Sequence, residues 1–248
     1  AWLIDEEGAR PSQIMAVTFT NKAAAEMRER LETLRPGIHG YWVGTFHGLA
    51  HRLLRLHPLE AGLPESFQVL DGDEQVKLVK QVIRDMQLDD EVFEPRPITA
   101  WINAQKDEAK GPKDVRITNP MVETQVEIFQ AYQERCDLGG LVDFAELLLR
   151  AVRLFQSNPS LLSHYQRRFE HLLVDEFQDT NGVQYGFVRL LAGESGKVFV
   201  VGDDDQSIYG WRGAKIENMQ RFLEDYEGAV LLKLEENYRS TGNILEAA

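Results

Sequence analysis

Short runs of apolar, mostly β-branched residues alternate along the chain with longer segments in which apolar residues recur every three or four positions. A strand followed by a helix, several times in succession, is typical of an α/β protein whose parallel sheet is covered by helices. We therefore predict an α/β fold with a parallel sheet. Its strands are expected at Ile14 to Phe19, Tyr41 to Val43, Leu172 to Val174, Val198 to Val201 and Val230 to Leu234.

A long stretch between the second and third of these runs has little strand signal. Apolar residues repeat there with the period of amphipathic helices, most clearly at residues 73–86, 121–135, 141–155 and 161–169. Proline and glycine residues between these segments mark the connecting loops. The pattern predicts a helical insertion into the α/β part.

The composition is that of an ordinary globular protein. Of the 248 residues, 43% are apolar and 27% charged, which excludes a disordered or fibrous chain. The longest apolar runs are far shorter than the ~20 residues of a membrane-spanning helix, so we expect no membrane partner. Cys136 is the one cysteine, and because it cannot form an internal disulfide we expect a cytoplasmic protein.

The formal net charge of −13 argues against a protein that coats nucleic acid with bulk positive charge. Residues 1–60 nevertheless carry equal numbers of acidic and basic side chains, whereas residues 61–214 carry an excess of acids. If a polyanion binds, the first sixty residues are the better candidate. The alternative is chance variation in a solvated surface.

Both ends of the chain have a helical pattern without the usual start or stop signals. Residues 1–4 begin with no initiator methionine, cap residue or leading strand, and residues 244–248 break off within a helical pattern. We expect the chain to be a piece of a longer protein, so the lack of a signal peptide carries little weight.

Two carboxylates follow the apolar run that ends at Val174. Asp175 and Glu176 are expected at the carboxyl edge of the parallel sheet, where α/β folds bind ligands. In a nucleoside triphosphatase the first carboxylate can hold Mg²⁺ and the second can orient and deprotonate the attacking water. The alternative is a strand end with solvated acids followed by a helix cap.

The run that ends at Val201 leads into a loop that mixes acids, an amide, two aromatic residues and a cation. Tyr209 and Trp211 stand beside Arg212 in this loop, residues 202–214. Exposed aromatics next to arginine suit the stacking of unpaired bases, which needs little sequence preference. The alternative is that both aromatics pack beneath the insertion as core.

A third strand end, at residues 18–21, presents hydroxyls and an amide just before a helix. Such a helix start, with its free N–H groups, suits phosphate oxygens. Phe19 within it is either a further stacking platform or core. Thr45, Phe46 and His47 repeat the arrangement after the next strand.

Taken together, these blocks resemble the UvrD/Rep group of superfamily 1 DNA helicases over essentially the whole chain. Six blocks occur in the order of that family, and a chance match of all six is negligible. They are Val17 to Ala24, Gly44 to His47, Leu141 to Phe144, Val174 to Thr180, Gly202 to Ala214 and Asn237 to Thr241.

The resemblance implies the first, incomplete motor domain of a RecA-like P-loop NTPase with an inserted all-helical subdomain. The motor domain, 1A, would comprise residues 1–47 and 169–248, and the inserted subdomain, 1B, would comprise residues 48–168. The implied activity is that of an ATP-dependent DNA helicase that moves 3′ to 5′ in DNA repair and replication. Its cofactors would be ATP and Mg²⁺. Its partners would be single-stranded DNA, junctions of single- and double-stranded DNA, and DNA-repair proteins.

The resemblance also assigns roles to individual residues. Asp175 would hold Mg²⁺, Glu176 would be the hydrolytic base and Gln206 would sense the γ-phosphate. Tyr238 would stack on the adenine, and Arg239 would contact the γ-phosphate, consistent with a planar cation at a transferring phosphoryl group. The residues that would meet single-stranded DNA are Phe19, Asn21, Thr45, His47, Tyr209, Trp211 and Arg212.

The chain also departs from the family pattern. No Gly-x-x-x-x-Gly-Lys-Ser/Thr loop occurs in it, and nothing after Ala248 supplies the second motor domain. We therefore expect the chain on its own to be inactive as an ATPase. Two alternatives stay open: a single-stranded-DNA-binding module that does not hydrolyse ATP, and part of a helicase–nuclease subunit.

Overall fold

A four-stranded parallel sheet organises the part of the chain that a computed structural model describes, namely residues 1–37, 39–194, 196–203, 206 and 217–234. The strand order is β2-β1-β5-β6, and every neighbouring pair is parallel. All four strands therefore end at one edge of the sheet. Their bounds are β1 Ile14–Thr18, β2 Trp42–Thr45, β5 His171–Val174 and β6 Lys197–Val200.

Helices begin directly at this carboxyl edge because polar residues there cap them. Thr20 accepts a hydrogen bond from the backbone N–H of Ala23 and starts α2 (Asn21–Leu34). Thr45 does the same for α3 (Phe46–Leu56), and Asn181 for α9 (Gly182–Ala192). Side-chain caps of this kind satisfy N–H groups that the first helical turn leaves unpaired.

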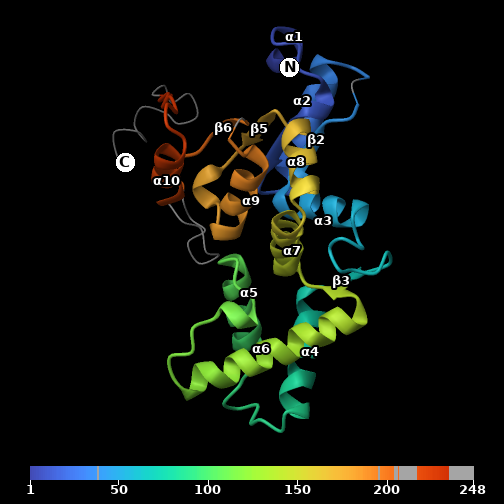
Figure 1. The fold of residues 1–248 in the computed structure, drawn as a ribbon, viewed down its shortest axis with the longest axis vertical. Coiled ribbons are helices and arrows are strands. Elements are labelled where there is room, and N and C mark those ends of the chain that lie inside the picture. The colour runs from blue at the N-terminus through green and yellow to red at the C-terminus, as the bar shows by residue number, and fades with distance from the viewer. Residues whose placement is uncertain (38, 195, 204–205, 207–216, 235–248) are drawn as a thin grey trace, which may run out of the picture.

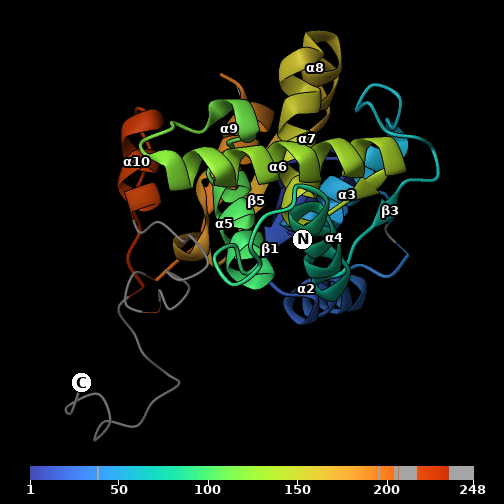
Figure 2. The same ribbon diagram turned by 90° about the horizontal axis from the view of Figure 1, so that it is seen from below.

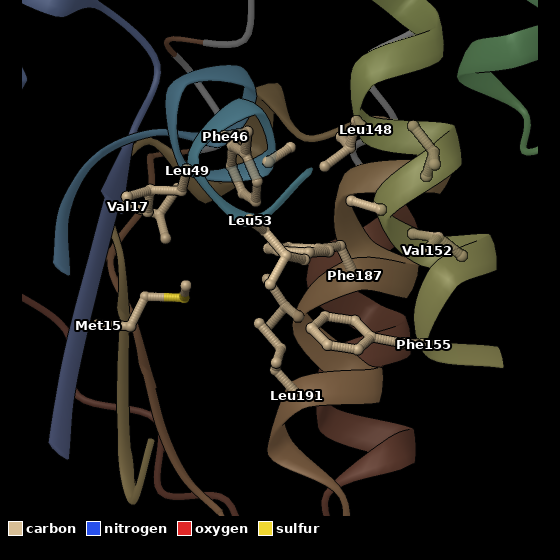
Figure 3. Packing of buried hydrophobic residues seen from close by; sticks show 14 of the residues in the cluster. Met15, Val17, Phe46, Leu49, Leu53, Leu148, Val152, Phe155, Phe187 and Leu191 are labelled. Atoms are coloured by element: carbon tan, nitrogen blue, oxygen red, sulfur yellow. The ribbon is translucent and has the colours of Figure 1, made fainter. Parts of the chain in front are cut away.

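The main core lies between the sheet and three helices. Figure 3 shows side chains of β1, α3, α7 (Phe144–Ser157) and α9 pointing into it. Met15 and Val17 of β1, two residues apart and therefore on the same face of the strand, contribute to it. Tyr165 of α8 (Pro159–Arg168) also belongs to this core.

A second core is built by α4 (Gly72–Asp85), α5 (Pro95–Asp107) and α6 (Pro120–Gly139). Figures 1 and 2 place these three helices together at one end of the long axis of the molecule. A two-residue parallel ladder joins β3 (Gln68–Val69) to β4 (Leu141–Val142) at the base of this unit. The stretch that the sequence predicts as helical thus contains this one short ladder among its described residues.

The helices at the ends of residues 48–168 pack with the sheet. Helices α3, α7 and α8 contribute to the main core, whereas α4, α5 and α6 form the second one. The domain limits at residues 47 and 169 stay a prediction. The two cores separate nearer to the β3–β4 ladder.

A buried lysine connects the two parts. The Nζ of Lys106, at the end of α5, lies 2.5 Å from Oδ2 of Asp143 and 3.0 Å from Oε2 of Glu146, at the start of α7. The hydroxyl of Tyr132 on α6 donates a hydrogen bond of 2.7 Å to Asp143. Burial alone would lower the pKa of Lys106, but the two carboxylates outweigh it and raise that pKa. Lys106 is therefore charged at neutral pH.

The prediction of a fifth strand at Val230 to Leu234 is wrong. The described residues after α10 (Glu217–Asp225) contain no strand, and the side chains of Leu232 and Leu234 are 77% and 94% exposed. A short apolar run becomes a strand when its backbone pairs with a neighbour, and none of the described strands pairs with this run.

Within the described residues, no helix combines the length and the apolar character that crossing a membrane requires.

Candidate functional site

Asp175 and Glu176 lie where the sequence predicts them, immediately after β5 at the carboxyl edge of the sheet. The backbone N–H of Asp175 donates to the carbonyl of Val17, at 2.9 Å, and the Thr18 hydroxyl lies 3.4 Å from Oδ2 of Asp175. Glu176 is exposed and has a φ of 52° in the left-handed region. A non-glycine residue rarely adopts this conformation, and such strain is found at functional turns.

Two acids at this turn have a raised pKa. Burial and then the charge of Glu176 raise the pKa of Asp175 above its usual value, and the same two causes raise that of Asp179. Asp179 is 7% exposed, and its Oδ1 atom has no hydrogen-bond partner within the described residues. A bound cation would stabilise these carboxylates in their charged form.

The oxygen atoms at this turn are suitable ligands for Mg²⁺. The carboxylate of Asp175 and the hydroxyl of Thr18, 3.4 Å apart, supply oxygen atoms of the kind that this ion prefers, and Mg²⁺ is usually held by one or two carboxylates together with waters or phosphates. No three His, Cys, Asp or Glu side chains of the described residues lie close enough to hold a metal among themselves. The ion would therefore take its other ligands from water or from a bound phosphate compound.

The strand ends next to Asp175 carry the residues predicted to meet DNA. Phe19 follows β1, is half-buried and packs edge-on against Phe46, with ring centroids 5.9 Å apart. It is thus in part a core residue, and one side of it is accessible. Asn21 is exposed in the first turn of α2, and the Thr45 hydroxyl accepts a hydrogen bond from the N–H of Gly48.

His47 stacks on Phe144, with ring centroids 4.3 Å apart. Burial lowers the pKa of His47 to about 4, so its imidazole is neutral at physiological pH. Phe144, the first residue of α7, is 59% exposed. Phe144 is not among the site residues predicted from the sequence. The signal that was missed is a large apolar side chain directly after the cap residue Asp143.

Several predicted site residues lie outside the described part of the chain. They are Tyr209, Trp211, Arg212, Tyr238 and Arg239. Gln206 is described: it is exposed, and its Nε2 donates to Oδ2 of Asp203 at 2.5 Å. The structure thus brings Asp175, Glu176, Thr45, His47 and Phe19 to one edge of the sheet.

The chain is similar to a known protein family over most of its length. The profile of the UvrD/REP helicase N-terminal domain matches residues 1–227, which is most of the chain. The chain belongs to the UvrD/REP helicase family. Its described α/β part is then the RecA-like domain that the resemblance implied, with its parallel sheet.

Individual UvrD/REP helicases match over the full length of the chain. It is 57% identical to DNA helicase II of Escherichia coli and 58% identical to DNA helicase II of Salmonella typhimurium. It is 45% identical to the ATP-dependent DNA helicase PcrA of Leuconostoc citreum. In each case the alignment covers 100% of this chain and 34–35% of the relative, so the chain spans about a third of the length of these helicases.

Proposed function

We propose that this chain is the nucleotide-binding and DNA-contacting part of an ATP-dependent DNA helicase that moves 3′ to 5′ along single-stranded DNA. One observation carries the proposal. The carboxylate pair Asp175–Glu176 lies at the same sheet edge as the polar and aromatic ends of β1 and β2. A UvrD/REP helicase needs both a triphosphate site and a DNA surface, and this edge offers the chemistry for each.

In the proposed mechanism Asp175 would hold the Mg²⁺ ion that accompanies ATP. Bound Mg²⁺ would neutralise charge on the phosphates during transfer. Glu176 accepts the proton of the attacking water, which its exposure at the turn allows. Three further residues complete the nucleotide site. Gln206 senses the γ-phosphate, Arg239 contacts it, and Tyr238 stacks on the adenine.

On the DNA side, aromatic side chains stack on bases and the polar ones contact phosphates. Base stacking contributes about 1–3 kcal/mol per base and does not read base edges, so it suits a motor that moves on any sequence. Phe19, Tyr209 and Trp211 supply the stacking, Asn21, Thr45 and Arg212 supply polar contacts, and His47 supplies a neutral one.

The broader setting follows the same family. We propose that the protein acts in the cytoplasm on single-stranded DNA and on junctions with duplex DNA, in repair and replication and together with repair proteins. The inserted helices lie beside the sheet and would meet the DNA near the junction.

The proposed catalytic role is tested by Glu176→Gln in the full-length protein. The amide keeps the size of the side chain but cannot accept the proton, so kcat for ATP should fall by about 10²- to 10⁴-fold while nucleotide binding is retained. Steady-state ATPase assays and nucleotide titrations measure the two quantities. Glu127→Gln, which changes an exposed glutamate on α6, is the matched control. Turnover close to normal in Glu176→Gln would contradict the role of Glu176.

A further inference from the structure

Gln178 connects the proposed base to the next strand end. Its side chain is 1% exposed and uses both ends of its amide. The Nε2 donates to Oε2 of Glu176 at 2.8 Å, and the Oε1 accepts from the backbone N–H of Asp203 at 3.1 Å. Because these two hydrogen bonds share one rigid amide group, a shift at one end changes the geometry at the other.

The close approach of Gly202 fixes this arrangement. A Cβ at Gly202 would lie 2.8 Å from Oε1 of Gln178 and 3.2 Å from its backbone nitrogen, which is closer than real side chains approach. The N–H of Phe177 also donates to the carbonyl of Val201, at 2.9 Å. The turn after β5 and the backbone after β6 are thus in direct contact.

A second tether lies just beyond the same turn. The Nδ2 of Asn218, near the start of α10, donates to the carbonyl of Thr180 at 2.8 Å and to its hydroxyl at 3.1 Å. Both side chains are fully buried. Asp203 and Asn218 are therefore both hydrogen-bonded to residues that follow Glu176, and the proposed DNA contacts Tyr209, Trp211 and Arg212 lie between these two residues in the sequence.

The proposed phosphate sensor belongs to the same chain of contacts. The backbone N–H of Gln206 donates to the carbonyl of Asp203 at 3.0 Å, and its side chain donates to the Asp203 carboxylate. Glu176, Gln178, Asp203 and Gln206 are thus linked in series by hydrogen bonds.

We propose that Gln178 is a positioning residue that couples the orientation of the Glu176 carboxylate to the segment carrying Gln206 and the DNA contacts, with Thr180 and Asn218 as the second tether. This inference rests on the proposed function, because it assumes that Glu176 is the base. A residue held at both ends transmits a change only if the two sites favour different arrangements of it. In this proposal the two sites are the nucleotide site and the DNA surface, and each favours a different arrangement of Gln178.

The test uses three variants of the full-length protein. Gln178→Met has a similar length and makes neither hydrogen bond. Gln178→Glu keeps an oxygen that accepts from Asp203 but replaces the donor to Glu176 with a second carboxylate. Gln166→Met is the matched control, since Gln166 is a half-buried glutamine whose amide donates to the Leu190 carbonyl elsewhere.

Two measurements are made on each variant. The first is kcat and KM for ATP with single-stranded DNA present. The second is the ratio of the DNA dissociation constants with and without a non-hydrolysable ATP analogue, which measures coupling directly. Thermal unfolding of each variant shows whether the fold is retained.

For Gln178→Met we expect kcat to fall by about 10- to 100-fold, because small misplacements of a catalytic group have effects of that size, while KM for ATP changes by less than about twofold. The coupling ratio should move toward one. For Gln178→Glu, kcat should fall similarly but the coupling ratio should stay closer to that of the parent. Gln166→Met should match the parent in both.

The inference is overturned if Gln178→Met keeps kcat within about twofold and leaves the coupling ratio unchanged. It is equally overturned if Gln166→Met loses as much coupling as Gln178→Met, since the effect would then be general. Asn218→Ala should also move the coupling ratio toward one, and its effect on kcat should be smaller than that of Gln178→Met. The result for Glu176→Gln separates the two proposals: if that variant is inactive while Gln178→Met is normal, this inference alone fails.

Discussion

The imidazole of His47 is held against Phe144 and is half-buried. Because burial lowers its pKa to about 4, the ring is uncharged throughout the range from about pH 5.5 upward. A histidine at a DNA-binding surface is often taken as a cation. In the proposed DNA contact, His47 would contribute a hydrogen bond and a flat contact surface.

The neutral state of His47 leads to a prediction about salt. His47→Ala should weaken single-stranded DNA binding by about 1 kcal/mol and leave the slope of log Kd against log salt unchanged, because no phosphate counterion is released by a neutral ring. Anisotropy titrations at several salt concentrations measure this slope. Arg212→Ala is the comparison, since losing a cation should make the slope less steep. A flatter slope for His47→Ala would mean that the ring is protonated in the complex.

At the same scale, the sequence predicted which residues would form the site but not how their side chains are held. Asp175 and Glu176 were recognisable as a pair after an apolar run. Their contacts with Thr18 and Gln178 were not, because the former joins residues 157 positions apart and the latter depends on the left-handed turn at Glu176. Phe144 was overlooked for the same reason: its neighbour His47 is distant in sequence.

Among the elements, the junction of α5 with α7 depends on a buried charge. Lys106 is paired with Asp143 and Glu146 inside the protein, and Tyr132 donates to the same carboxylate. Burial would raise the pKa of Asp143, but the charge of Lys106 lowers it below the usual value. Lys106 and Asp143 therefore stay ionised together, and removing Lys106 takes away the cation that faces both carboxylates.

Lys106→Met tests this junction. We expect it to lower the free energy of unfolding by about 3–5 kcal/mol, because two buried carboxylates lose their cation. Urea denaturation followed by circular dichroism gives the value. Lys110→Met is the control, since Lys110 makes an exposed ion pair with Glu108 and should change stability by less than about 1 kcal/mol. A small effect for Lys106→Met would show that water or a rearrangement replaces the cation.

The outcome for the strands separates local from non-local information. β1, β2, β5 and β6 appear within one or two residues of the predicted runs, because strand-forming residues bounded by polar ones are a local signal. Val230 to Leu234 has the same local signal, but this run pairs with none of the four described strands of the sheet. The composition of a run does not show whether its backbone will pair with another strand.

For the whole molecule, the acidic turn determines what the chain can do alone. Asp175, Glu176 and Asp179 gather negative charge at the place where a triphosphate would bind, and this sequence contains no P-loop lysine to balance it. The β- and γ-phosphates need such a lysine and a cradle of N–H groups. We therefore predict that these 248 residues by themselves hydrolyse no ATP above background.

A phosphate-release assay on the purified chain, with single-stranded DNA and Mg²⁺ present, measures this. The Glu176→Gln form of the same chain is the control for contaminating ATPases, and the two should give equal rates. DNA-stimulated turnover that disappears in the Glu176→Gln form would show that the chain binds and hydrolyses ATP without a P-loop.

The sequence by itself determined the parallel α/β fold, the helical character of the insertion and the family, because each rests on patterns that are local or lie in a fixed order along the chain. Tertiary structure decided the rest. It placed α3, α7 and α8 in the core of the sheet, neutralised His47 by burial and paired Lys106 with the carboxylates of α7. It also joined Gln178 to both Glu176 and Asp203. These features depend on the environment that distant segments create around a residue, and no local pattern of hydrophobic and polar positions encodes that environment.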